Sequence, residues 1–381
     1  MMQARAGGAP ILCVVGARPN FMKIAPLIRA MKDPSRPVPV RLVHTGQHYD
    51  QQMNSQYFRS LGIPEPDVNL EVGSASHAVQ TAEIMRRFEP VLDKEQPAAV
   101  LVVGDVNSTL ACALVAAKKG VAVIHVEAGL RSFDRTMPEE VNRVLTDQIS
   151  DILFTTEKSA RENLLREGVS GSSIHFVGNV MIDTLRYSLA QAVPAERTLS
   201  LHGTSAKWGQ EGYAVLTLHR PSNVDVPGTL RLLLNAVVEI SRRLPVVFPI
   251  HPRTRSRIEQ AGLGSILETA SLIKLPPLDY LEMLGLMRTA KLVLTDSGGL
   301  QEETTALGVP CVTLRDNTER PITVEEGTNA LAGQDHFRIL ALADDILRTG
   351  GKAGRIPDLW DGQAAQRIVA VLHDWLAGTD R

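Results

Sequence analysis

Short apolar runs rich in valine, isoleucine and leucine recur along the first half of the chain, separated by stretches with helical spacing. The runs read ILCVVG from Ile11, then PVRLVHTG, AAVLVVGD, VAVIHVE, DILFTT and SIHFVG. Strands that are buried on both faces read as continuous apolar runs, and their alternation with helices is typical of a parallel sheet covered on both faces. The pattern therefore predicts an α/β fold.

A second series of the same kind starts near Tyr213, with the runs YAVLTLH, PVVFPIH, SLIKLP, KLVLTD and PCVTLR. A chain of 381 residues is long enough for two domains that each bury a core. We expect two Rossmann-like domains that face each other across a cleft, an N-terminal domain over 1–180 and a C-terminal domain over 181–365.

The segment 190–212 contains no strand-like apolar run and carries several glycines, so we interpret it as a loop near the domain boundary. The last residues, 366–381, belong to an amphipathic helix expected over 362–376, with Ile368, Leu372 and Trp375 on its apolar side. In proteins with two such domains, a C-terminal helix can pack back on the N-terminal domain.

Composition narrows the possible partners and the location. Hydrophobic residues make up 44% and charged residues 22%, as in ordinary globular proteins, and the net charge of -2 gives no general attraction to nucleic acid or to an anionic membrane. No signal peptide is recognisable, and no run approaches the ~20 apolar residues of a membrane span. Cys13, Cys112 and Cys311 are odd in number and lie in apolar runs, which is typical of buried reduced thiols and favours the cytoplasm.

Polar side chains follow the apolar runs at the points where the strands are expected to end. In an open α/β sheet these positions lie at the carboxyl ends of the strands, where ligands bind. A single polar residue there is equally explained by the polarity of loops. Six such positions together favour a binding site: Arg18, Asp105, Glu127, His219, His251 and Ser297.

The segment TDSGGLQEE, residues 295–303, lies between an expected strand and an expected helix. Ser297, Gly298 and Gly299 allow backbone N–H groups at the helix N-terminus to approach a phosphate, which the helix dipole also favours. Glu303 lies one to two turns further along, where its carboxylate can accept hydrogen bonds from a ribose diol. The alternative is an ordinary turn in which Asp296 or Ser297 caps the helix.

The first strand is followed by GARPNFMK and not by a glycine-rich GxGxxG turn, so bound NAD is not expected. Arg18 and Lys23 instead bring positive charge that suits a diphosphate, or they form a solvated surface pair.

Several histidines invite the hypothesis of a metal site, among them His125, His219, His251 and those of HTGQHYD. Their spacing matches neither HExxH nor a paired Cys/His pattern, so we expect no metal.

Acidic residues are unusually dense beside the run VIHVE, in the segment HVEAGLRSFDRTMPEEVNR. Asp105, Glu127 and Glu139 are candidates for accepting and donating protons, since carboxylates shielded from water can exchange protons near neutral pH. Pro138 suits the first turn of a helix. For either Glu139 or Glu140, the alternative role is a favourable interaction with that helix dipole.

Eight segments in this order closely resemble the non-hydrolysing UDP-N-acetylglucosamine 2-epimerases: GARPNFMKIAPL, HTGQHYD, VVGDVNSTLA, HVEAGLRSFDRTMPEEVNR, LTLHRPSN, FPIHPRT, TDSGGLQEE and RDNTERP. The resemblance runs from Ile11 to the C-terminal helix. It implies the two-domain GT-B fold, a homodimer, no cofactor and a role in polysaccharide biosynthesis. Asp50 and residues 73–78 depart from members that a second substrate molecule activates, so activation of that kind is not implied.

The resemblance also assigns roles to residues. It implies that the phosphates contact Ser297 and Gly298, that the ribose contacts Glu303, and that Arg18, His219 and Arg320 assist. Lys23, His251 and Gly299 are added as substrate contacts from their positions in the sequence alone. Those that it implies for catalysis are Asp105, Glu127, Glu139 and His219.

The family is understood to invert C2 by eliminating UDP to give a glycal, followed by re-addition of UDP and protonation from the opposite face. HTGQHYD and RSFDRTMPEE also resemble epimerases of 2,3-diacetamido uronic acid sugars, which keeps the exact sugar open. A GT-B glycosyltransferase is the alternative from another enzyme class, and a UDP-sugar sensor is a non-catalytic one. Neither requires several carboxylates beside a buried strand.

Overall fold

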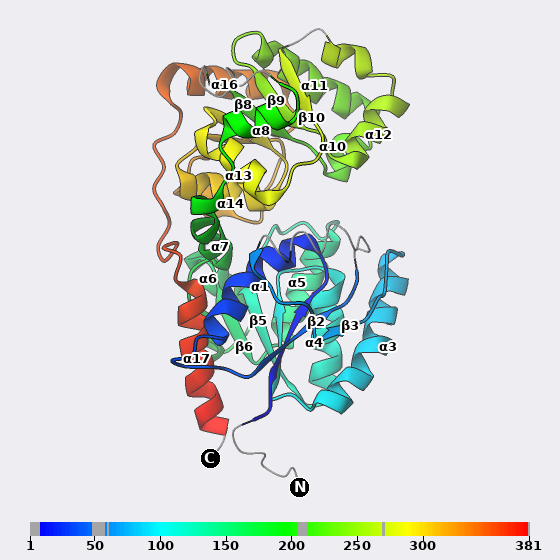
Figure 1. Cartoon of the computed structure of the whole chain (residues 1–381), viewed down its shortest axis with the longest axis vertical. Helices are drawn as coiled ribbons and strands as arrows, with labels where there is room; N and C mark the ends of the chain where they lie inside the picture. Colours follow the sequence, from blue (N-terminus) through cyan, green and yellow to red (C-terminus); the bar gives the residue numbers. More distant parts are fainter. Residues whose placement is uncertain (1–7, 48–57, 59–60, 205–211, 269–270, 380–381) are drawn as a thin grey trace. The chain divides into compact units, whose positions relative to one another are not determined.

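The computed structural model describes residues 8–47, 58, 61–204, 212–268 and 271–379, except the side chains of Arg18 and Thr379 (Figure 1). The chain forms two compact units. The first unit comprises Met1–Tyr187 together with Asp358–Arg381, and the second unit comprises Ser188–Pro357.

The first unit contains a parallel sheet of seven strands in the order β3-β2-β1-β4-β5-β6-β7. The strands are β1 (Ile11–Val15), β2 (Val40–His44), β3 (Val68–Asn69), β4 (Ala99–Val103), β5 (Ala122–Ala128), β6 (Ile152–Thr155) and β7 (Ile174–Phe176). β1 and β4 are buried along their whole length, which explains their unbroken apolar sequences. The order reverses between β1 and β4, and such a switch point opens a crevice at the carboxyl ends of the strands.

Helices cover this sheet and connect its strands. They are α1 (Arg18–Met31), α3 (His77–Glu95), α4 (Asn107–Lys118), α5 (Pro138–Gln148), α6 (Lys158–Arg166), α7 (Val180–Ser188) and α17 (Ala364–Thr379), with the 3₁₀ turn η1 (Gly171–Ser173). One core joins Ile84, Phe88 and Leu92 of α3 to Val100 and Val102 of β4.

The C-terminal helix α17 packs beside α1 in the first unit (Figure 1). Asp183 of α7 caps it, accepting hydrogen bonds from the backbone N–H groups of Ala364 at 3.1 Å and Ala365 at 2.7 Å. Most of α7 therefore belongs with the first unit, which extends beyond the expected boundary at residue 180.

The second unit contains a parallel sheet of six strands in the order β10-β9-β8-β11-β12-β13. The strands are β8 (Ala214–Thr217), β9 (Val246–Pro249), β10 (Leu272–Leu275), β11 (Leu292–Thr295), β12 (Cys311–Thr313) and β13 (Asn329–Leu331). The helices are α8 (Ala195–Leu201), α10 (Pro221–Val224), α11 (Pro227–Ser241), α12 (Pro252–Gln260), α13 (Tyr280–Thr289), α14 (Gly298–Leu307), α15 (Pro321–Glu325) and α16 (His336–Thr349), with η2 (Leu189–Gln191) and η3 (Gly264–Glu268). Its switch point lies between β8 and β11.

The α/β prediction is confirmed, and the connection between the two sheets differs from the sequence interpretation. The segment 190–212, expected to be a loop, contains helix α8. Ala195, Thr198 and Leu199 are buried there, and α8 packs against α13. Tertiary burial therefore produces a helix too short to show a clear period in the sequence.

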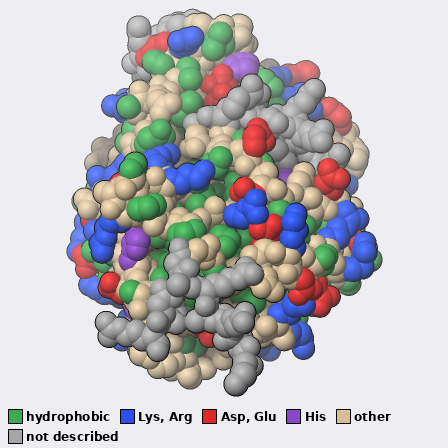
Figure 2. All heavy atoms as spheres, turned by 60° about the horizontal axis from the view of Figure 1, so that its bottom comes forward, with side chains coloured by type: hydrophobic (Ala, Val, Ile, Leu, Met, Phe, Trp, Pro, Cys, Tyr) green, Lys and Arg blue, Asp and Glu red, His purple; other side chains and the backbone are tan. Residues whose placement is uncertain are grey.

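Basic and acidic side chains are intermixed on the face shown in Figure 2, in keeping with the near-zero net charge. Within the described residues, no helix is long and apolar enough to cross a membrane.

Candidate functional site

In the first unit, the candidate residues gather at the carboxyl edge of the sheet. Asp105 follows β4, Glu127 lies near the end of β5, and Arg18 opens α1 after a two-residue turn that follows β1. β4 pairs with both β1 and β5, so the topology brings these three positions to the switch point. The side chain of Arg18 lies outside the described part of the structure.

Glu127 has a backbone conformation that is unusual for a residue with a side chain. Its φ is 72°, in the left-handed region, and the pairing of β5 with β6 shifts register between Val126 and Ala128. Such an irregularity re-aims a side chain at the end of a strand and has a conformational cost that the surrounding structure must offset.

Lys23 binds this carboxylate directly. Its Nζ lies 2.6 Å from Oε1 of Glu127, and both side chains are almost fully buried. Lys23 passes close to Gly104, where a Cβ atom would lie 2.7 Å from Nζ, and Gly104 itself has a φ of +67°. Glycine at position 104 therefore allows both the turn after β4 and the approach of Lys23 to Glu127. The sequence predicted that Lys23 contacts the substrate. It did not indicate the ion pair between Lys23 and Glu127, which lie far apart along the chain.

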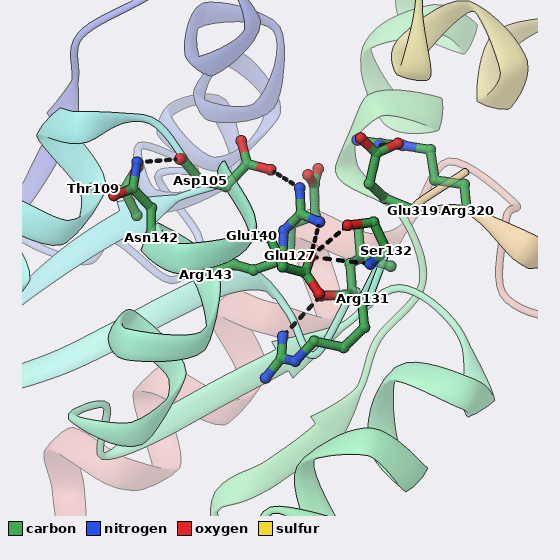
Figure 3. A network of polar contacts seen from close by, with 12 residues as sticks. Asp105, Thr109, Glu127, Arg131, Ser132, Glu140, Asn142, Arg143, Glu319 and Arg320 are labelled. Carbon is green, nitrogen blue, oxygen red and sulfur yellow. Dashed lines mark hydrogen bonds and ion pairs between the residues drawn. The ribbon is translucent and has the colours of Figure 1, made fainter. Parts of the chain in front are cut away.

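Asp105 is held by a second cation, Arg143 of α5 (Figure 3). Arg143 also binds Glu140 at 2.6 Å, and Asn142 donates a hydrogen bond to the backbone oxygen of Asp105 at 2.9 Å. The side chain of Asp105 is 21% exposed, so it is the more accessible of the two carboxylates.

Glu139 and Glu140 have different environments in the first turn of α5, which begins at Pro138 as expected. Glu140 is buried and accepts hydrogen bonds from the backbone N–H groups of Ser132 at 3.0 Å and Phe133 at 2.8 Å. It therefore anchors the preceding loop, while the partly exposed Glu139 is the one of the pair available to a ligand.

In the second unit, His219 stands at the end of β8 beside the end of β11, since these two strands are paired. Its Nδ1 lies 2.8 Å from Oδ1 of Asp296, which is fully buried. Asp296 also accepts hydrogen bonds from the backbone N–H groups of His219 and Arg220, at 3.0 and 2.9 Å. Burial alone would raise the pKa of Asp296, but the hydrogen bond from His219 and those from the backbone outweigh it, and the pKa is lowered. Asp296 is thus the ionised group that orients His219.

The N-terminus of α14 is the strongest candidate for an anion site. Ser297 is its N-cap residue, and its side chain makes no capping hydrogen bond. Gly298 and Gly299 form the first turn, whose N–H groups have no partner within a helix. The Arg320 guanidinium lies directly over Gly298, where a Cβ atom would be 2.7 Å from Nη1. Glycine at position 298 therefore leaves room for the close approach of the Arg320 guanidinium to the helix N-terminus.

Three arginines surround Glu319 next to this helix end. Arg315 binds it with two contacts of 3.0 Å, and Arg220 and Arg320 lie 3.5 and 3.6 Å away. Burial would raise the pKa of Glu319, but these three cations lower it strongly. Arg320 also binds Glu302 at 2.9 Å, so basic and acidic side chains alternate beside this helix end. The helix dipole and the guanidinium of Arg320 over Gly298 both favour a bound anion.

Glu303 of α14 is buried with an incompletely bonded carboxyl group. Burial raises its pKa to about 7; a hydrogen bond with Tyr280 opposes the rise and the charge of Glu302 adds to it. Within the described residues, its Oε1 has no hydrogen-bond partner. Buried polar atoms are rarely left unbonded, so the group is suited to a ligand that donates hydrogen bonds.

His251, another predicted contact, caps α12 by accepting a hydrogen bond at Nδ1 from the backbone N–H of Arg253 at 3.2 Å. Its ring also lies near that of His219, with centroids 5.9 Å apart and the ring planes tilted by 46°. His251 therefore has a structural role in addition to its place at the sheet edge.

No group of three or more His, Cys, Asp or Glu side chains that could hold a metal ion occurs among the described residues. The three cysteines are buried free thiols. His48 and Asp50 of HTGQHYD lie outside the described residues.

Comparison with known proteins assigns a family to these two units. The family model described as UDP-N-acetylglucosamine 2-epimerase matches residues 31–373. The UDP-N-acetylglucosamine 2-epimerase of Methanococcus maripaludis is 45% identical over 339 residues, covering 88% of this chain and 91% of that protein. The UDP-2,3-diacetamido-2,3-dideoxy-D-glucuronate 2-epimerase of Pseudomonas aeruginosa is 42% identical over 366 residues, covering 95% and 99%.

A solved structure is similar over nearly the whole chain. It is the crystal structure of the Methanocaldococcus jannaschii UDP-GlcNAc 2-epimerase in complex with UDP-GlcNAc and UDP. The TM-score is 0.86 at 41% sequence identity, and the match covers 96% of this chain and 99% of that one. The two parallel-sheet units are therefore those of a GT-B-like protein.

Proposed function

Because this chain belongs to the UDP-N-acetylglucosamine 2-epimerase family, we propose that it interconverts UDP-N-acetylglucosamine and UDP-N-acetylmannosamine by inversion at C2. The C2 proton is not next to a carbonyl group, so its direct removal would leave an unstabilised carbanion. Departure of UDP from C1 solves this problem, since positive charge develops at C1 and C2–H becomes acidic. The reaction then needs no NAD and no metal.

The electron and proton changes balance in two steps. In the elimination, the C1–O bond breaks with its electron pair on UDP, a carboxylate takes the C2 proton, and a C1–C2 double bond forms. In the return step, an acid protonates C2 from the opposite face and UDP adds again to C1. Two acid/base groups are therefore needed.

The second unit supplies the UDP contacts in this proposal. Ser297, Gly298 and Gly299 at the N-terminus of α14, with Arg320, bind the diphosphate and stabilise its charge as it departs. Glu303 accepts hydrogen bonds from the ribose diol, a role that its unbonded Oε1 supports. His219 is placed by Asp296 to act on the diphosphate, and Arg18 and His251 are further substrate contacts.

The first unit supplies the acid/base groups, for which we propose Asp105, Glu127 and Glu139. The observation that carries the proposal is the placement of Asp105 and Glu127 at the ends of adjacent strands, each bonded to its own cation. The 2.6 Å contact with Lys23 holds the carboxylate of Glu127 in a fixed position. A protein that only binds UDP-sugars would not require this arrangement.

Proton NMR in D2O with UDP-N-acetylglucosamine, and with no NAD, metal or acceptor added, tests the reaction. We expect an anomeric signal of the manno epimer and deuterium at C2 in both epimers. A glycosyltransferase or a sensor would leave the sugar unchanged under these conditions.

A second candidate substrate is a UDP-2,3-diacetamido uronic acid sugar, because the Pseudomonas aeruginosa relative that is named for that sugar is 42% identical over 95% of this chain. The same NMR experiment with the uronate distinguishes the two. Exchange at C2 of the uronate alone would assign the chain to that substrate.

The acid/base assignment is tested by Asp105→Asn, Glu127→Gln and Glu139→Gln. Each loss of a positioned acid or base is expected to lower kcat by about 10²–10⁴-fold. Near-normal turnover of all three variants would refute the assignment.

We also propose that the enzyme is a cytoplasmic homodimer that serves polysaccharide biosynthesis. The buried free cysteines support a reducing compartment. Light scattering of the purified protein measures the oligomeric state, and a monomer mass would refute the dimer.

A further inference from the structure

His125 lies two residues before Glu127 on β5 and is completely buried. Its Nδ1 is 2.6 Å from Oδ1 of Asp147 on α5, and its Nε2 is 2.8 Å from the backbone oxygen of Gly104. Both ring nitrogens are therefore occupied by groups of the protein, and the ring has no exposed surface with which to contact a substrate.

The two partners determine where protons lie. A backbone oxygen only accepts hydrogen bonds, so Nε2 of His125 must carry a hydrogen. The other carboxyl oxygen of Asp147, Oδ2, accepts from the backbone N–H of Gly129 at 3.1 Å and from Nη1 of Arg131 at 2.7 Å. At 2.6 Å, Nδ1 and Oδ1 would repel each other unless one of them carried a hydrogen, so a proton lies between His125 and Asp147.

The same network balances its own charge. Arg131 binds Glu167 at 2.8 and 2.5 Å in addition to Asp147. With the proton on His125, two positive groups pair with two negative ones; His125, Asp147 and Arg131 are buried, and the side chain of Glu167 at the edge of the network is 29% exposed. A buried network that is fully bonded and balanced is rigid, whereas removal of one member leaves a charge uncompensated.

This network bonds to the backbone next to each of the two candidate carboxylates, Asp105 and Glu127. Gly104 directly precedes Asp105, and its carbonyl is bonded to His125. Gly129 follows Glu127 by two residues, and its N–H is bonded to Asp147. Glu127 itself has a φ of 72°, a conformation that costs about 1–3 kcal/mol and persists only where its surroundings hold it.

We propose that His125 and Asp147, joined by this proton, are positioning residues that hold the backbone of Asp105 and Glu127 in the arrangement needed for catalysis. The inference rests on the proposed function, in which those two carboxylates act on the sugar. His125 and Asp147 contact neither substrate nor reacting atoms. They act through the turn at Gly104 and through the left-handed residue Glu127.

The test compares His125→Asn, Asp147→Asn and the double variant with the control Asp151→Asn. Asp151 accepts a hydrogen bond from the backbone N–H of Val123 at 2.8 Å, so it is a carboxylate bonded to the opposite end of the same strand. We expect kcat to fall about 10²-fold in each single variant, since a displacement of about 1 Å has that effect on positioned groups. The double variant should lose no more than the single ones, because the two residues act as one pair.

Substrate binding separates positioning from general loss of structure. KM and the Kd for UDP should change little in all variants, because the proposed ribose contact and most of the proposed diphosphate contacts belong to the second unit. The Asp151→Asn control should keep normal kcat. Equal kcat in Asp147→Asn and Asp151→Asn, or a parallel loss of UDP binding and kcat, would overturn the inference.

A measurement on the unaltered protein does not depend on turnover. In protein labelled with ¹⁵N-histidine, both ring nitrogens of His125 should carry hydrogens, and the proton on Nδ1 should resonate far downfield, as in short His–carboxylate hydrogen bonds. Absence of that proton overturns the inference even if the enzyme is active. If the unaltered protein exchanges no C2 proton, the proposed function fails, and this resonance alone decides whether the pair exists.

Discussion

Replacement of Glu303 by glutamine should stabilise the ligand-free protein above neutral pH and weaken UDP binding. In the folded protein, burial raises the pKa of Glu303 from its ordinary value of 4.5 to about 7, against the opposing hydrogen bond with Tyr280. A raised pKa means that the protonated carboxyl group stabilises the fold at low pH. That contribution is fully present below about pH 4.5 and is lost as the pH rises towards about 7.

The size of the effect follows from the shift. A difference of about 2.5 pKa units corresponds to about 3 kcal/mol at pH values above both pKa values. Glutamine has the same shape but no charge, so Glu303→Gln should avoid this loss. At about pH 8 we expect a free energy of unfolding up to about 3 kcal/mol larger than that of the unaltered protein, and little difference at about pH 4.

Urea unfolding of the ligand-free protein across this pH range measures the effect. Glu259→Gln is the matched control, because Glu259 is an exposed glutamate of α12 in the same unit. The control should follow the pH dependence of the unaltered protein. A Glu303→Gln variant that is destabilised equally at all pH values would refute the reasoning, since it would mean that burial does not disfavour the ionised carboxylate.

UDP binding provides the second half of this prediction. If the ionised Glu303 accepts hydrogen bonds from the ribose, UDP binding requires loss of the proton and should weaken about tenfold per pH unit below about 7. Calorimetry should show a Kd about 10-fold to 10²-fold higher for Glu303→Gln, as expected for a hydrogen bond to a charged group. The pH dependence that remains in the variant belongs to the phosphate of UDP. An unchanged Kd would remove Glu303 from the UDP site.

Three further substitutions test the contacts around the two sheet edges. Lys23→Met removes the ammonium group from the buried Glu127 and should destabilise the first unit by about 3–5 kcal/mol, measured by urea unfolding; an unchanged midpoint would contradict the buried ion pair. Gly104→Ala places a Cβ atom 2.7 Å from Nζ of Lys23 at a φ of +67°, so we expect a loss of about 1–3 kcal/mol in stability and a lower kcat, with UDP affinity unaffected. Asp296→Asn replaces the ionised acceptor of His219 and of two backbone N–H groups, and kcat/KM should fall at least about tenfold; retention of normal kcat/KM would show that His219 needs no orienting group.

The sequence by itself determined the elements that are long or fully buried. All eleven strands expected from the apolar runs are present, because a strand covered on both faces must be apolar along its length. The edge strands β3 (Val68–Asn69) and β13 (Asn329–Leu331) were not predicted, because each contains an asparagine and neither lies in an apolar run. The polar residues after the strands were predicted for the same topological reason, namely that parallel strands end at one edge.

Only the tertiary structure decided which of these polar residues are partners. Lys23 and Glu127 are 104 positions apart, and His219 and Asp296 are 77 apart, so no local pattern links them. The sequence assigned Asp296 the role of a possible cap and gave no role to Glu319 or Asp147, although all three are buried charges that hold a neighbouring side chain or backbone turn. The periodicity of a sequence reports how each element is buried. It does not report which elements become neighbours, and the pairing of buried charges depends on that neighbourhood.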